Sequence, residues 1–203
     1  MKIYLLMFVR YLNGGLMSKI ILVTGGARSG KSTFAEKLAT KLTDKTKAYI
    51  ATAQIFDDEM AQRIRIHQNR RGEDWKTFEA PFNAEAAITE AGNSYDVILF
   101  DCLTIYLSNF ICAFESLDDL DKINCDLINN VNKLIDSAKN IKGTIIFVTN
   151  EVGDGIVPEN KLARVYRDCA GIANQMIAQE SDEVYLVVAG IPVNIKNIEV
   201  KLN

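Results

Sequence analysis

The segment IILVTGGARSGKS, residues 20–32, decides the fold that the rest of the chain has to fit. Its first five residues form an apolar strand pattern, and the remaining eight match the phosphate-loop pattern G-x-x-x-x-G-K-[ST]. An amphipathic helical pattern over 31–42 follows directly. In such a loop the backbone N–H groups point at phosphate oxygens, Lys31 reaches the β- and γ-phosphates, and Ser32 ligates Mg²⁺. The segment therefore predicts a site for a nucleoside triphosphate.

Apolar, often β-branched runs alternate with amphipathic helical runs along the rest of the chain. This alternation predicts an α/β fold: a single P-loop NTPase-like domain with a mostly parallel sheet and helices on both faces. Ligands of such sheets bind at the carboxyl ends of the strands. The predicted strands are 20–24, 47–52, 96–101, 144–149 and 184–189, and the predicted helices are 31–42, 120–138 and 161–179.

Composition excludes several classes of protein. The 203 residues carry a net charge of -3, which does not suit a nucleic-acid partner, and 48% hydrophobic residues argue against a largely disordered chain. No apolar run is long enough for stable membrane insertion. The cysteines show neither zinc-site nor redox spacing, and we expect a reduced, cytoplasmic setting. They are Cys102, Cys112, Cys125 and Cys169.

The first residues stand apart from this pattern. Residues 1–16 read MKIYLLMFVRYLNGGL, and Arg10 interrupts their short apolar stretch. A second methionine, Met17, directly precedes the first strand. We therefore expect the folded domain to span 17–203, with 1–16 as an extension or a mis-assigned start. A short membrane- or partner-binding segment is the alternative interpretation.

A metal-binding carboxylate is predicted at the end of another strand. Residues 96–101 read DVILFD, so Asp101 follows four apolar residues. A carboxylate in that position binds Mg²⁺ directly or through water. The alternative is that Asp101 caps a helix that begins at Cys102 or Leu103. The motifs DxxG and NKxD do not follow in the required places, which disfavours a regulatory GTPase.

The single histidine of the chain, His67, lies in the segment DDEMAQRIRIHQNRR, residues 57–71. The segment has acidic residues at its start and arginines at its end, as suits a helix dipole, and Met60, Ile64 and His67 share one face. A packed core histidine is one interpretation. The surrounding arginines suit phosphate groups, so His67 as a nucleophile that attacks the α-phosphorus of a nucleotide is the other.

With these motifs the sequence resembles the bifunctional adenosylcobinamide kinase / adenosylcobinamide-phosphate guanylyltransferases of cobalamin biosynthesis. The resemblance covers about 20–196 and is most specific around His67 and after residue 149. The stretches that carry it are ILVTGGARSGKS, YIATAQIFDDEMAQRIRIHQ, W-x-T-x-E at 75–79, TNEVGDGIVPEN at 149–160, LARVYRD at 162–168 and DEVYLVVAGIPVNIK.

The resemblance implies two reactions that use Mg²⁺ with GTP, or ATP as the kinase donor. Adenosylcobinamide is phosphorylated, and adenosylcobinamide phosphate then receives GMP from a guanylyl-histidine at His67. It also implies a homotrimer, with Lys31 and His67 as catalytic residues and Ser32 and Asp101 at the metal. The implied nucleotide contacts are Gly25, Gly26, Ala27, Arg28, Ser29, Gly30, Lys31, Ser32, Ala51, Thr52, Ala53, Gln68, Asn69, Arg70, Arg71, Glu79 and Asp101.

Some roles stay open at the level of the sequence. Glu79 is placed either to orient His67 or to contact the guanine or ribose. The family more often has Glu at the position of Asp101, and the shorter side chain sets the carboxylate back by roughly 1.5 Å. Residues 68–71 also depart from the family pattern, and the loop 150–160 is a candidate for the corrinoid side. The competing functions are a plain small-molecule or nucleoside kinase and a non-enzymatic, nucleotide-dependent binding protein.

Overall fold

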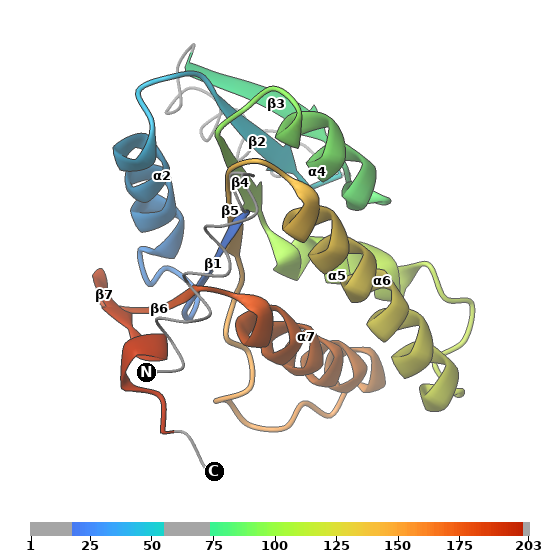
Figure 1. Cartoon of the computed structure of the whole chain (residues 1–203). Coiled ribbons are helices and arrows are strands. Elements are labelled where there is room, and N and C mark those ends of the chain that lie inside the picture. The colour runs from blue at the N-terminus through green and yellow to red at the C-terminus, as the bar shows by residue number, and fades with distance from the viewer. Residues whose placement is uncertain (1–17, 55–73, 201–203) are drawn as a thin grey trace.

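The computed structural model in Figure 1 describes residues 18–54 and 74–200. Predictions for 1–16 and for the segment 57–71, which includes His67, therefore lie outside the described residues. The elements are β1 (Lys19–Thr24), α2 (Lys31–Leu42), β2 (Lys47–Ala51), β3 (Trp75–Glu79), α4 (Ala84–Gly92), β4 (Val97–Asp101), α5 (Leu103–Cys112), α6 (Leu120–Asn140), β5 (Thr144–Val148), α7 (Lys161–Glu180), β6 (Glu183–Val188), β7 (Ile191–Asn194) and the 3₁₀ helix η2 (Ile195–Ile198).

One seven-stranded sheet, in the order β3-β2-β4-β5-β1-β6-β7, forms the centre of the molecule. All its pairings are parallel except that of β6 with β7. This confirms the predicted mostly parallel sheet. The β6–β7 turn consists of Ala189 and Gly190, with φ of 50° and 81°, the left-handed conformation that tight hairpins require.

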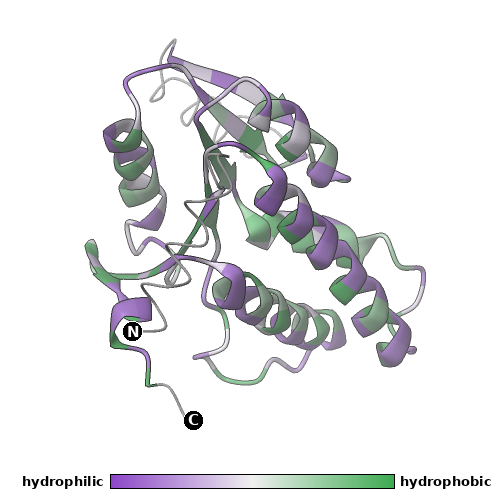
Figure 2. Cartoon of the chain, viewed as in Figure 1, coloured by the Kyte–Doolittle hydropathy of each residue, from purple (hydrophilic) through white to green (hydrophobic). Residues whose placement is uncertain are grey.

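Helices cover both faces of this sheet, as predicted (Figure 1). On one face α2 packs its buried Ala35 and Ala39 against strand residues such as Ile21 and Val23. The other face of the sheet, which includes Leu22 of β1, is covered by α4, α5, α6 and α7. The central strands β1, β4 and β5 are largely apolar, as expected where helices cover both faces. In Figure 2 the helices α6 and α7 carry both hydrophobic and hydrophilic residues.

Five elements were not predicted from the sequence: β3, β7, α4, α5 and η2. The helix α5 reads LTIYLSNFIC and is apolar on nearly every side, so it shows little amphipathic pattern. The strand β3 lies at the sheet edge with only part of its surface buried. By contrast α6 buries Ile123, Leu127, Val131 and Leu134 at helical spacing, and its prediction is confirmed.

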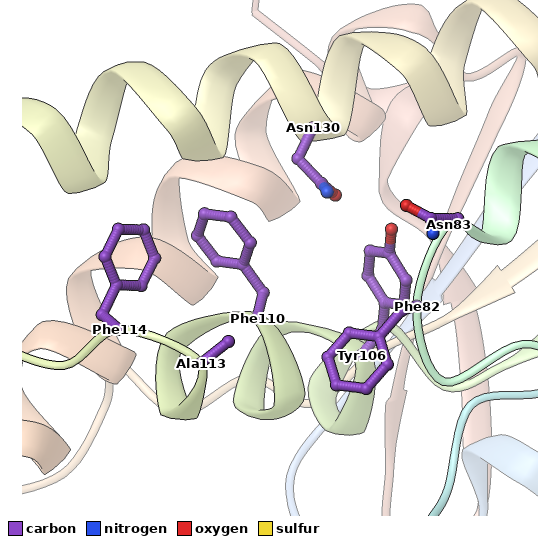
Figure 3. Close-up of a pocket in the computed structure, with 7 residues that line it drawn as sticks. All are labelled: Phe82, Asn83, Tyr106, Phe110, Ala113, Phe114 and Asn130. Atoms are coloured by element: carbon purple, nitrogen blue, oxygen red, sulfur yellow. The ribbon is translucent and has the colours of Figure 1, made fainter.

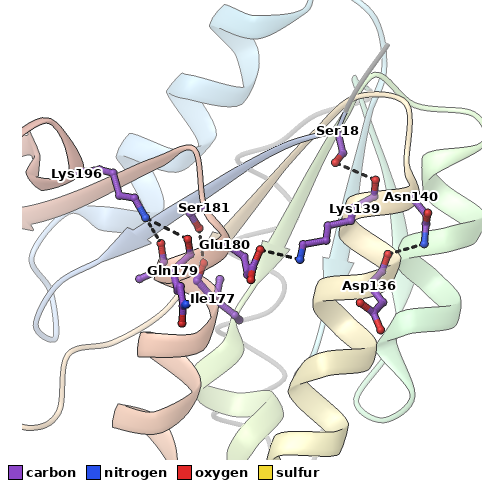
Figure 4. A network of polar contacts seen from close by, with 10 residues as sticks. Ser18, Asp136, Lys139, Asn140, Ile177, Gln179, Glu180, Ser181 and Lys196 are labelled. Carbon is purple, nitrogen blue, oxygen red and sulfur yellow. Dashed lines mark hydrogen bonds and ion pairs between the residues drawn. The ribbon is translucent and has the colours of Figure 1, made fainter. Parts of the chain in front are cut away.

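Polar contacts connect the elements at the amino ends of the parallel strands (Figure 4). The Lys139 ammonium pairs with Glu180 at 2.7 Å, which joins the last turns of α6 and α7. Ser18, directly before β1, donates to the Lys139 carbonyl, and Lys196 donates to the Ala178 carbonyl at 2.7 Å. These bonds lie at the sheet edge opposite the phosphate loop. No helix in the described part of the chain is long and apolar enough to cross a membrane.

Candidate nucleotide-binding site

The phosphate loop lies against the β6–β7 turn. The amide N–H of Gly190 donates to the Ser29 carbonyl at 2.8 Å. A Cβ at Gly25 would lie 2.4 Å from the Val187 carbonyl oxygen, so no larger residue fits there. Gly30 has φ of 95°, a left-handed conformation that strains other residues, and a Cβ there would lie 3.2 Å from the Cα of Gly190. The two glycines are therefore required by the course of the loop.

The start of α2 has the features of an anion-binding site. Gly30 caps this helix, and no side chain bonds to the cap. The first N–H groups of a helix then remain available, and the helix dipole adds partial positive charge. Thr24 and Ser29, on either side of the first loop glycines, have buried hydroxyl groups without hydrogen-bond partners. Phosphate oxygens would satisfy such groups.

Lys31 folds back over the loop. Its ammonium donates to the carbonyl of Gly26 at 3.1 Å. Burial lowers the pKa of Lys31, while the nearby Cys102 and Asp101 act to raise it. Lys31 is thus close enough to the β4 carboxylate to feel its charge.

Asp101 is the last residue of β4, and β5 separates it from β1. The hydroxyl of Tyr49 donates to its Oδ2 at 3.0 Å. The N-cap residue of α5 is Cys102 and not Asp101. The hydroxyl of Ser32 and the carboxylate of Asp101 are hard oxygen ligands, which fit Mg²⁺. The described residues hold no cluster of three or more acidic, His or Cys ligands.

The predicted contacts after β2 gather at the same carboxyl edge. Ala51 pairs in register with Glu79 on one side and with Asp101 on the other. The Thr52 hydroxyl donates to the Cys102 carbonyl at 2.8 Å and accepts from the Cys102 N–H at 2.9 Å. Ala53 follows directly in the chain. Two further contacts, Gln68 and Asn69, lie outside the described residues, as do His67, Arg70 and Arg71.

Three supporting residues of this edge were missed by the sequence reasoning. Tyr49 looks like any buried strand residue, and only the structure shows that it orients Asp101. Asn109 is 7% exposed and donates to the carbonyls of Thr52 and Pro81. Burial raises the pKa of the Cys102 thiol to about 12, so this neighbour of Lys31 is not a thiolate nucleophile at neutral pH. Nothing in the sequence pattern marks these three.

The segment after β5 also contacts the phosphate loop. The N–H of Glu151 donates to the carbonyl of Gly25 at 3.1 Å. Further along, Ile156 is 96% exposed and Val157 is 64% exposed. This segment is the loop 150–160, which the sequence suggested for the corrinoid side.

A separate cavity of about 300 Å³ lies between α5, α6 and the residues before α4 (Figure 3). No charged side chain lines it, so it does not suit phosphate. In Figure 3 the hydroxyl of Tyr106 and the amide of Asn130 face each other across its inner end. The lining residues are Phe82, Asn83, Tyr106, Phe110, Ala113, Phe114 and Asn130.

Comparisons with known proteins place these features in a family. Residues 21–195 match the family model "CobU: Cobinamide kinase / cobinamide phosphate guanyltransferase". The "Bifunctional adenosylcobalamin biosynthesis protein CobU" of Salmonella typhimurium is 43% identical over 183 residues, which cover 87% of this chain and 99% of the relative. The protein of the same name from Escherichia coli is 42% identical with the same coverage. The "Bifunctional adenosylcobalamin biosynthesis protein CobP" of Pseudomonas aeruginosa is 38% identical over 86% of this chain and 96% of the relative.

Among solved structures, flagellar accessory protein FlaH from Methanocaldococcus jannaschii matches with 17% identity and a TM-score of 0.45, over 91% of this chain and 80% of that one. The RadB recombinase matches with 16% identity and a TM-score of 0.48, over 88% and 79%. The family assignment rests on the match over 21–195 and on the three relatives. The chain belongs to the cobinamide kinase / cobinamide phosphate guanyltransferase family.

Proposed function

We propose that this chain carries out both reactions of its family. In the first, a hydroxyl oxygen of adenosylcobinamide attacks the γ-phosphorus of GTP or ATP, the bond to the β-phosphate breaks, and the nucleoside diphosphate leaves. In the second, a ring nitrogen of His67 attacks the α-phosphorus of GTP and pyrophosphate leaves. A phosphate oxygen of adenosylcobinamide phosphate then attacks the same phosphorus, which breaks the N–P bond, frees His67 and gives adenosylcobinamide-GDP.

The observation that carries this proposal is a complete phosphate loop in a chain of this family. The charge of Asp101 acts on the loop lysine, Lys31, and partly offsets the lowering of its pKa by burial. Lys31 and the first turn of α2 hold the β- and γ-phosphates and stabilise the charge on the leaving group. Ser32 and Asp101 would hold Mg²⁺, which neutralises phosphate charge when bound. The Tyr49 hydroxyl keeps the Asp101 carboxylate oriented.

The remaining assignments follow from the family resemblance. Residues 68–71 and Glu79 contact the nucleotide near His67, and the exposed loop 150–160 faces the corrinoid. The chain forms a homotrimer and acts in the cytoplasm. The position of Glu79 supports its assignment, because it lies in register with Ala51 at the carboxyl edge of the sheet.

A labelling experiment tests the covalent step. Purified protein is incubated with Mg²⁺ and GTP labelled at either the α- or the γ-phosphorus, without corrinoid. We expect acid-labile, base-stable α-label on His67 and no γ-label, because pyrophosphate carries the γ-phosphorus away. The His67→Ala protein should remain unlabelled and still transfer the γ-phosphoryl group to adenosylcobinamide. Absence of α-label from the wild-type protein, with intact kinase activity, would show a plain kinase instead.

A further inference from the structure

The proposed function brings two phosphate-bearing molecules to one edge of the sheet. GTP takes the phosphate loop, whereas the acceptor of the second reaction carries a phosphate monoester of its own. In the second reaction the acceptor phosphate has to approach the phosphate of the guanylyl-histidine, and two anions repel each other, so a cation beside the acceptor phosphate would favour this approach. Among the described residues near this edge, Arg167 is a cation with an unsatisfied nitrogen.

Arg167 lies in the second turn of α7. One of its guanidinium nitrogens, Nη2, donates to the carbonyl of Gly153. The other, Nη1, is buried and has no hydrogen-bond partner. No carboxylate pairs with Arg167 in the part of the chain that the structure describes. The guanidinium keeps its charge in any environment, and an unpaired buried donor is costly, so the group lacks an anionic partner.

A short series of contacts connects Arg167 to the phosphate loop. The N–H of Gly153, whose carbonyl binds Arg167, donates to the Glu151 carboxylate at 2.7 Å. The backbone N–H of Glu151 in turn donates to the carbonyl of Gly25 at 3.1 Å. Arg167 therefore binds Gly153, which lies two residues after Glu151, the residue that contacts the phosphate loop. One short segment, 151–153, thus contacts both the phosphate loop and Arg167.

The same face of α7 leaves open space. Gly171 and Asn174 follow Arg167 at spacings of four and seven, which place all three on one face of the helix. A Cβ at Gly171 would meet nothing within 4 Å, although glycine inside a helix is unfavourable. Arg167, Gly171 and Asn174 are all partly exposed, so solvent reaches this face.

The segment after β5 closes this face on one side. Asn174 accepts from the Thr149 hydroxyl at 2.8 Å and donates to the Asn150 carbonyl at 3.2 Å. The side-chain oxygen of Asn150 is buried without a partner.

We propose that Arg167, Gly171 and the segment 149–153 form a second phosphate site, which binds the phosphate monoester of the acceptor, adenosylcobinamide phosphate. A guanidinium binds phosphate oxygens through its planar N–H groups, and the absent side chain at Gly171 leaves room for the phosphate ester. The site is needed for guanylyl transfer and not for the kinase reaction, in which the acceptor brings a neutral hydroxyl. This inference rests on the proposed function.

The test compares two arginines of α7 that bind carbonyls of the same loop. Arg164 is exposed and donates to the Pro158 carbonyl at 3.0 Å, so Arg164→Met removes a loop contact without removing the unpaired donor. Arg167→Met should raise the KM for adenosylcobinamide phosphate by about tenfold or more, as expected for a lost charged hydrogen bond. Its kinase kcat/KM for adenosylcobinamide and its α-label on His67 should stay within about threefold of wild type. Arg164→Met should leave all three quantities unchanged.

Two further variants separate binding from folding. Arg167→Lys keeps the charge and should recover part of the lost affinity. Gly171→Ala should raise the melting temperature, because alanine favours a helix, and yet raise the KM for adenosylcobinamide phosphate, because its methyl group fills the space. A role of this face in folding alone predicts a higher melting temperature without a change in KM.

Different outcomes would overturn the proposed function and the second phosphate site. Wild-type protein that neither phosphorylates adenosylcobinamide nor transfers GMP would overturn the proposed function. The second phosphate site alone would be overturned if the wild-type protein performs both reactions but Arg167→Met lowers kcat/KM equally for adenosylcobinamide and adenosylcobinamide phosphate. It would also be overturned if Arg164→Met and Arg167→Met raise the KM for adenosylcobinamide phosphate equally.

Discussion

At the scale of single residues, the site depends on a few side chains whose neighbours set their chemistry. Lys31 is held by the Gly26 carbonyl, and Asp101 by the Tyr49 hydroxyl. Lys31 belongs to a motif, so its role could be predicted from the sequence. Tyr49 belongs to none, because a hydrogen bond between neighbouring strands depends on their register.

Lys31→Ala should abolish both activities. The lysine is the cation of the phosphate loop, and both reactions need the triphosphate in place, so each rate should fall by roughly a hundredfold or more. Assays of γ-phosphoryl transfer and of guanylyl transfer measure this directly. Lys37→Ala, an exposed position on the same helix, is the control and should retain both activities. A Lys31→Ala protein with normal kcat/KM in either assay would remove the lysine from that reaction.

Tyr49→Phe tests the orientation of the metal carboxylate. Without the 3.0 Å bond to Asp101, the apparent KM for Mg²⁺ should rise by about tenfold, as for lost partners of metal ligands elsewhere. Mg²⁺ titrations of the kinase rate give this value. Tyr185→Phe removes a matched bond, 2.7 Å to Glu183 in β6, and should leave the Mg²⁺ requirement unchanged. Equal Mg²⁺ curves for both variants would contradict the role of Tyr49.

At the scale of elements, close packing at turns decides where residues can change. The turn between α6 and β5 brings Gly143 against β4, where a Cβ would lie 2.4 Å from the Asp96 carbonyl oxygen. That carbonyl accepts from Thr144 at 2.9 Å, so it is not free to move. The start of β5 is thus fixed by contacts between backbones.

Gly143→Ala should therefore destabilise the fold by about 2 kcal/mol, the usual cost of overpacking. Gly155→Ala adds the same methyl group where nothing lies within 4 Å, and its stability should stay within about 0.5 kcal/mol of wild type. Urea unfolding followed by circular dichroism measures both. Similar midpoints for the two variants would show that the turn accommodates the extra carbon.

At the scale of the whole molecule, the sequence was enough to predict the architecture and the phosphate loop. The central strands and the amphipathic helices α2, α6 and α7 could be predicted because their patterns are local. The helix α5 and the edge strands β3 and β7 could not, because their burial depends on neighbours far away in the sequence. The supports of the site, Asn109 among them, join segments 28 to 57 residues apart and have no local signal.

The distribution of the cysteines over the molecule gives a prediction about thiol reactivity. Cys112 and Cys125 are exposed, whereas burial raises the pKa of Cys102 to about 12 and that of Cys169 to about 11. Alkylation requires the thiolate, so iodoacetamide at pH 8 should modify only the exposed pair in the folded protein. Peptide mass spectrometry identifies the modified residues, and urea should make all four react. Rapid alkylation of Cys102 without urea would show that its environment opens.

The packing of the phosphate loop against the β6–β7 turn has a consequence for synthesis on the ribosome. The loop is complete in sequence by residue 32, but the groups that pack against it, the Val187 carbonyl and the Gly190 amide, follow more than 150 residues later in the chain. A nascent chain that lacks them has the phosphate-loop sequence but not the β6–β7 turn that packs against the loop. We therefore expect GTP-dependent protection from proteases to begin only with nascent chains that extend past Gly190.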